Sequence, residues 1–188
     1  MTLNGAAITR LILLGLVASI LQLTAASQVS IFGVPMDLSP LIVASIGFLT
    51  GSVPGAVFGF CFGLFADTAL MQTLGVTSLV LTVIGYGAGR VRELRDPAHG
   101  LAPVAVGAAA TAIAALAVTL LQFLLGVEAP VSAQVVRQIL MTIVINTLLA
   151  LPVYALCRRV LIRFLPDDPR RRRRRAYTTG GLSPLSRA

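Results

Sequence analysis

Residues 51–67 read GSVPGAVFGFCFGLFAD, an apolar stretch with one charged residue, and this stretch decides the fold. A small or polar residue recurs at every fourth position, at Gly51, Gly55, Gly59, Gly63 and Asp67. Residues four apart lie on one side of an α-helix, so the glycines predict a ridge of bare backbone. Helices in lipid gain little from ordinary hydrophobicity and associate through such close contacts instead. The pattern predicts a membrane-spanning helix that packs through its glycines.

The composition of the whole chain agrees with a membrane protein. Of its 188 residues, 56% are hydrophobic and 12% are charged, which is too little charge to cover a soluble surface. A helix needs about 20 apolar residues to cross the hydrocarbon. We expect an all-α polytopic domain over residues 1–160 with about six transmembrane helices, and a disordered, arginine-rich tail over residues 161–188. The expected helices cover residues 8–26, 38–49, 53–66, 74–89, 101–125 and 135–156.

The second and third apolar runs are the ambiguous part of this topology. Residues 38–66 are long for one ordinary span and short for two. Pro54 disfavours helix at Val53 and suits the first turn of a new helix. We therefore interpret this region as a tight helical hairpin.

The arginines orient the chain. All 15 basic residues are arginine, the net charge is +8, and residues 170–175 form an unbroken arginine run. With six spans, the basic loop around Arg92 and the tail share the cytoplasmic side, and so does the N-terminus. Every arginine except Arg137 then lies on that side. Anionic lipids are the expected partner of the tail, and nucleic acid is not expected.

The glycine ridge has two interpretations. The first is packing between helices of this chain, and the second is a groove that binds the transmembrane helix of another protein. In the second, the aspartate fixes the outer end of the helix, and Arg137 on the same predicted face is a candidate ion-pair partner. The candidate binding residues are Gly51, Gly55, Gly59, Phe60, Gly63 and Asp67.

Residues that carry catalysis or bind metals form no recognisable pattern. His99 is the only histidine, and Cys61 and Cys157 lie far apart within apolar runs. No nucleophile has an apparent base, so we expect neither an enzyme nor a cofactor or metal. The polar residues Gln22, Gln122 and Asn146 lie within expected spans, and we expect each to hydrogen-bond across helices.

Three motifs give the chain a family resemblance. Residues 59–67 (GFCFGLFAD), residues 74–76 (LGV) and residues 85–86 (GY) resemble the most recognisable region of MreD, the rod shape-determining membrane protein family of bacteria. The arrangement of spans over residues 8–160 is similar too. The resemblance implies a fold similar to the substrate-binding subunits of energy-coupling-factor transporters.

The resemblance also implies a function. Members of this family are non-enzymatic scaffolds of the bacterial inner (plasma) membrane. They bind the transmembrane helix of MreC, belong with MreB, RodA and the elongation transpeptidase, and help position peptidoglycan synthesis. The alternative is a small-molecule (vitamin)-binding subunit of a membrane transporter.

Overall fold

The computed structural model describes residues 9, 13–15, 17–20, 22, 30–31, 34–35, 37–94, 102–126 and 133–161. The expected first helix is described only at its residues in these ranges, which are helical. The predicted disordered tail lies outside the described residues from position 162 onwards. The loops that carry Arg95 and Glu128 lie outside them as well.

Five helices make up almost all of the described chain: α2 (Ser39–Thr50), α3 (Ser52–Ala69), α4 (Val76–Leu94), α5 (Ala102–Leu124) and α6 (Ala133–Leu161). The described chain also contains a pair of two-residue antiparallel strands, β1 (Ser30–Ile31) and β2 (Val34–Pro35). The prediction of a helical fold is confirmed for this part of the chain. Among the described residues, three segments are long and apolar enough to cross a membrane: Ser52–Ala69, Ala102–Leu124 and Ile139–Leu161.

The hairpin predicted around residue 51 is present. Gly51 separates α2 from α3 and has φ 110°, a conformation that glycine adopts at no steric cost. The chain folds back there and brings the start of α3 against α2. A side-chain carbon added to Gly55 would lie 2.6 Å from the Gly47 Cα. The ambiguous region therefore forms two helices, of which α2 has only 12 residues.

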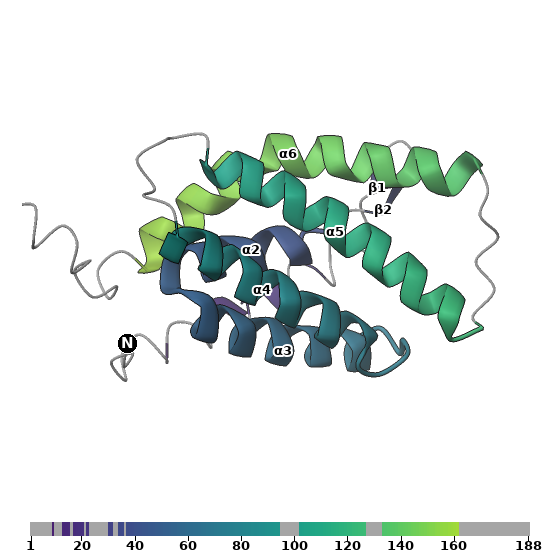
Figure 1. The fold of residues 1–188 in the computed structure, drawn as a ribbon, viewed down its shortest axis with the longest axis horizontal. Coiled ribbons are helices and arrows are strands. Elements are labelled where there is room, and N and C mark those ends of the chain that lie inside the picture. The colour runs from purple at the N-terminus through teal and green to yellow at the C-terminus, as the bar shows by residue number, and fades with distance from the viewer. Residues whose placement is uncertain are drawn as a thin grey trace, which may run out of the picture.

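α2 lies at the centre of the molecule. Every one of its residues is buried, and it contacts α3, α4, α5 and α6. Figure 1 shows α3 and α4 side by side along one edge and α5 and α6 along the other, with α2 between the two pairs. The short central helix therefore joins two pairs of longer ones.

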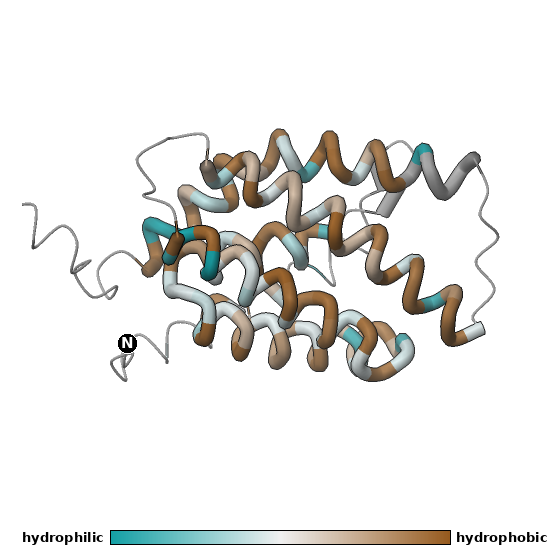
Figure 2. Tube along the Cα trace, viewed as in Figure 1, coloured by the Kyte–Doolittle hydropathy of each residue, from teal (hydrophilic) through white to brown (hydrophobic). Residues whose placement is uncertain are grey.

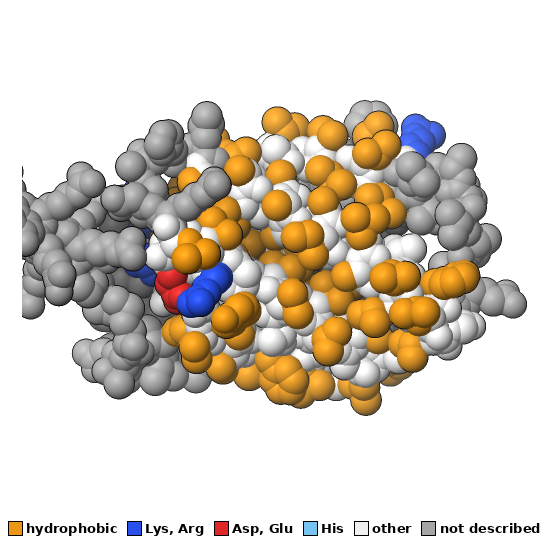
Figure 3. All heavy atoms as spheres, in the orientation of Figure 1, with side chains coloured by type: hydrophobic (Ala, Val, Ile, Leu, Met, Phe, Trp, Pro, Cys, Tyr) orange, Lys and Arg blue, Asp and Glu red, His pale blue; other side chains and the backbone are white. Residues whose placement is uncertain are grey.

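The outer surface of the helices is apolar. Large hydrophobic side chains are exposed along α3, α4, α5 and α6, and Figure 3 shows them spread over the middle of one face. Figure 2 shows the most hydrophilic positions near the ends of the helices. Arg90 and Arg92 lie near the end of α4, Arg158 near the end of α6, and Arg137 near its start. An apolar belt with charged ends suits a protein that spans a membrane.

Candidate functional site: a glycine seam and an outer groove

The glycine ridge of α3 packs against the backbone of α4. A side-chain carbon on Gly55 would lie 2.5 Å from the Gly85 carbonyl oxygen, and one on Gly59 would lie closer still to that of Leu81. Gly63 meets the backbone of Ser78 in the same way. Neither backbone can move aside for a side chain, so glycine is required along this contact. We call these three glycines together with Gly85 and Gly89 the glycine seam.

The seam bears on the two interpretations of the glycine ridge. α4 of the same chain packs on the face of Gly55, Gly59 and Gly63, and Gly51 serves the turn between α2 and α3. Internal packing, the first of the two interpretations, is what this structure contains. Among the candidate binding residues, Phe60 is the exposed one, with 52% of its surface accessible. That these residues bind a partner stays a prediction.

Asp67 is fully buried at the far end of the hairpin. Its Oδ2 accepts hydrogen bonds from the backbone N–H of Gly75 at 2.8 Å and of Ser78 at 3.4 Å. These donors belong to the start of α4, where backbone N–H groups have no partner within the helix. Asp67 does not form the expected ion pair with Arg137. Within the described part of the chain, the ion pair is the one between Arg90 and Glu93. Asp67 instead ties the end of α3 to the start of α4.

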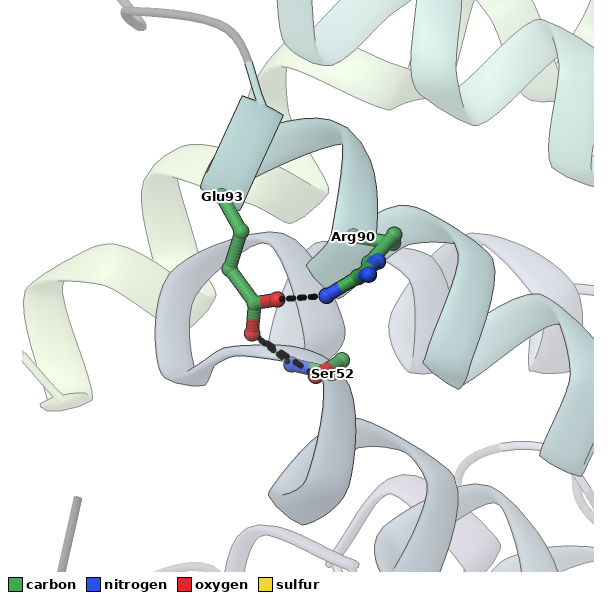
Figure 4. Close-up of polar contacts among 3 residues, drawn as sticks. All are labelled: Ser52, Arg90 and Glu93. Atoms are coloured by element: carbon green, nitrogen blue, oxygen red, sulfur yellow. Dashed lines mark hydrogen bonds and ion pairs between the residues drawn. The ribbon is translucent and has the colours of Figure 1, made fainter.

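The other end of α4 holds the turn between α2 and α3. Glu93 Oε1 accepts hydrogen bonds from the backbone N–H of Ser52 at 3.0 Å and from its hydroxyl at 2.7 Å, and Arg90 pairs with the other carboxylate oxygen at 3.2 Å (Figure 4). Arg92 donates to the carbonyl oxygen of Leu49 near the end of α2. The negative charge of Glu93 at the start of α3 and the positive charge of Arg92 at the end of α2 both complement the dipoles of those helices. We call this cluster the clasp.

The clasp lowers the pKa of Glu93. The Ser52 hydroxyl is the largest cause, followed by the Ser52 backbone N–H, and Arg90 adds a smaller contribution against the opposing effect of burial. Sequence reasoning missed the clasp. Its one signal was an acid among the arginines of residues 90–95, and the partners lie about 40 positions earlier in the chain.

A buried polar network links α6 to the rest of the bundle. Asn146 donates to the backbone carbonyl of Asp37 at 2.8 Å and to the Thr111 hydroxyl of α5 at 3.2 Å. Gln22 donates to the Asp37 carboxylate and accepts from the Leu38 backbone N–H. The expectation of interhelical hydrogen bonds is confirmed for Asn146, which bonds to α5, whereas Gln22 bonds to the two residues that precede α2. The side chain of Gln122 makes none within the described part of the chain.

A groove of about 420 Å³ lies on the outer side of α3 and α4. Its two hydroxyls are occupied, because Ser78 donates to the Phe60 carbonyl at 3.0 Å and Thr82 donates to the Ser78 carbonyl at 2.6 Å. The groove therefore presents shape and apolar surface rather than free polar groups. Its lining consists of Phe60, Leu64, Leu74, Gly75, Ser78, Leu79, Thr82 and Val83. We call it the outer groove.

The comparisons with known proteins identify one family. The family model described as rod shape-determining protein MreD matches residues 5–160, which is most of the chain. No curated protein and no solved structure matches this sequence.

Proposed function

Because the chain belongs to the MreD family of rod shape-determining proteins, we propose that it is a non-enzymatic scaffold of bacterial cell elongation that binds the transmembrane helix of MreC. It acts in the inner membrane, within the wider complex of MreB, RodA and the elongation transpeptidase. By holding MreC, it helps to position peptidoglycan synthesis. The family implies the role in rod-shape determination, and the partners are our proposal.

The outer groove supports this proposal. It lies on the pair of helices whose backbones touch along the glycine seam, so its two walls are held in fixed positions. A third helix gains affinity in lipid mainly from van der Waals fit, and a preformed groove supplies that fit without reorganisation. Phe60 and Leu79 stand exposed on opposite walls and provide the contact surface. We therefore place MreC on the outer side of the hairpin, not on its glycines.

The proposed topology has six spans, with the N-terminal arm and the tail in the cytoplasm, in a fold like that of the energy-coupling-factor substrate-binding subunits. The ends of α4 and α6 carry Arg90, Arg92, Arg158 and Arg159, which favours the cytoplasm for that side of the bundle. The arginine-rich tail then meets anionic lipids. Little among the described residues favours the alternative of vitamin binding, since the outer groove is apolar and the polar network bonds largely within itself.

Filling the groove tests the proposal. Leu79 is 58% exposed, so Leu79→Trp places a bulky ring in the groove without disturbing the core. We expect it to remove most of the MreC that co-purifies with the chain from membranes of co-expressing cells. Leu148→Trp on α6 is the matched control, because Leu148 is 75% exposed and lies away from the groove.

The measurement is the amount of MreC recovered per amount of folded chain. Equal recovery with Leu79→Trp and the wild type would place the binding surface elsewhere. Loss with Leu148→Trp alone would move it to α6. Failure of the wild-type chain to recover any MreC would contradict the proposed partner.

A further inference from the structure

Polar groups gather where α6 passes the end of α2. The ring of Tyr154 packs edge-on against that of Phe48, with 6.0 Å between centroids and 67° between planes. The next residue, Leu49, accepts the hydrogen bond from Arg92 of α4. A phenol from α6 and a guanidinium from α4 therefore lie against neighbouring residues of the last turn of α2.

A second guanidinium reaches the same place. Arg158 follows Tyr154 by four positions, which puts both on one side of α6. Arg92 is held beside them by its hydrogen bond to Leu49, the residue that follows Phe48. Arg158 is exposed, and Arg92 and Tyr154 are partly exposed. The three groups are accessible from outside.

No acid neutralises these two arginines within the described ranges. The ion pair at this end joins Arg90 and Glu93, and Glu93 also accepts two hydrogen bonds from Ser52. Arg92 donates one N–H to Leu49, which leaves other N–H groups of its guanidinium for a ligand. The cluster is therefore cationic and rich in donors.

We propose that Arg92, Tyr154 and Arg158 bind the phosphate of an anionic phospholipid headgroup. Guanidinium groups match phosphate oxygens with paired N–H donors, and a phenol adds an O–H donor. Basic pockets between transmembrane helices on the cytoplasmic side are typical binding sites for such headgroups. Tyr154 and Arg158 lie in the last two turns of the span Ile139–Leu161, the part of a spanning helix that approaches the headgroups, and the apolar helix faces accommodate the acyl chains.

The occupant is a lipid rather than an acidic protein because the site adjoins the apolar belt. The site is distinct from the arginine tail, since all three side chains belong to helices. It is also independent of MreC, so its failure leaves the proposed function unaffected.

The test measures the melting temperature of the full-length chain in neutral detergent. Phosphatidylglycerol, phosphatidylcholine or inorganic phosphate is titrated into the sample. We expect phosphatidylglycerol alone to raise the melting temperature. Arg158→Gln raises the concentration of lipid that gives half the effect by about tenfold, the size expected from losing one charge-assisted contact. Tyr154→Phe weakens binding less and keeps the ring that packs on Phe48.

Arg159→Gln is the matched control. It removes the same charge from the adjacent exposed position, and the tail remains intact. If phosphatidylglycerol stabilises this variant as it does the wild type, the result supports a specific site at Arg92, Tyr154 and Arg158. The proposal is overturned if Arg159→Gln weakens binding as much as Arg158→Gln, which would indicate a general basic field. It is also overturned if phosphatidylcholine or inorganic phosphate stabilises the protein as well as phosphatidylglycerol does.

Discussion

The two outer helix pairs of this protein pack by different means. α3 and α4 touch backbone to backbone along the glycine seam, and Asp67 and the clasp tie the two ends of the contact. α5 and α6 are longer and more apolar, yet only 22% and 11% of their spans are buried, against 33% for α3. In lipid, therefore, hydrophobicity indicates which helices span, and small residues indicate which ones associate closely.

The difference assigns different tasks to the two pairs. A seam of backbone contacts holds α3 and α4 at one fixed distance, which suits the proposed binding of MreC in the outer groove. α6 has few buried residues, and the polar network at Asn146 adds to its apolar contacts with the bundle. We expect substitutions in the seam to disrupt the fold and those around α6 to loosen it.

The largest effect is expected at the centre of the seam. Gly59→Leu drives a side chain into the backbone of α4 at Leu81, and overpacking against backbone cannot be relieved by rotamer changes. We expect little of this variant to be recovered as a monodisperse protein from membranes. Size-exclusion chromatography in detergent and the amount of protein in the membrane measure this.

Gly87→Leu is the matched control for the seam. Gly87 lies on α4 among the same residues, but a side-chain carbon there meets nothing within 4 Å. This variant should be recovered like the wild type. Normal recovery of Gly59→Leu would show that α3 and α4 are not in backbone contact and would remove the basis of the comparison.

The sequence predicts the glycine face of α3 but not which helix packs on it. The four-residue spacing of Gly55, Gly59 and Gly63 predicts a backbone face, because helix geometry alone relates those positions. Periodicity does not say which helix fills the face, and here the following helix of the same chain does. The turn at Gly51 was likewise predictable, since Pro54 marks a new helix start.

The polar partners were beyond prediction for a related reason. Asp67 was expected at a helix end, but its partners are orphan N–H groups of α4 and not the charge of Arg137. The clasp joins residues about 40 positions apart, and Asn146 bonds to a carbonyl 109 positions earlier. Such pairs depend on the packing of the bundle, which local pattern does not encode.

An intermediate effect is expected at Asn146. Asn146→Leu keeps the branched shape and the number of heavy atoms of the side chain but removes its donors to Asp37 and Thr111. We expect a loss of about 1 kcal/mol, the usual worth of an interhelical hydrogen bond in a membrane protein, measured by unfolding in mixed detergent. Thr147→Ala is the control, because the hydroxyl of Thr147 donates to the Ile143 carbonyl of its own helix and to no other helix that the structure describes. Equal losses in both variants would show that α6 is not held through Asn146.

The smallest effect is expected at the clasp, which is exposed to solvent. Because the folded protein lowers the pKa of Glu93 below its ordinary value of 4.5, ionised Glu93 stabilises the fold at neutral pH. This contribution is fully present above pH 4.5 and is lost as the pH falls below it through the lowered pKa. The difference in melting temperature between the wild type and Glu93→Gln should therefore shrink as the medium becomes acidic.

Two further variants separate the causes of that pH dependence. The hydrogen bond from the Ser52 hydroxyl is the largest single cause of the lowered pKa of Glu93, ahead of the hydrogen bond from Arg90 and ahead of the charge of Arg90. Ser52→Ala should therefore remove more of the pH-dependent difference than Arg90→Gln, although the backbone N–H of Ser52 still donates in the alanine variant. The reverse order would make the exposed ion pair the main contact, and exposed ion pairs contribute little to stability. The end of α4 would then be held by the seam and by Arg92 rather than by Glu93.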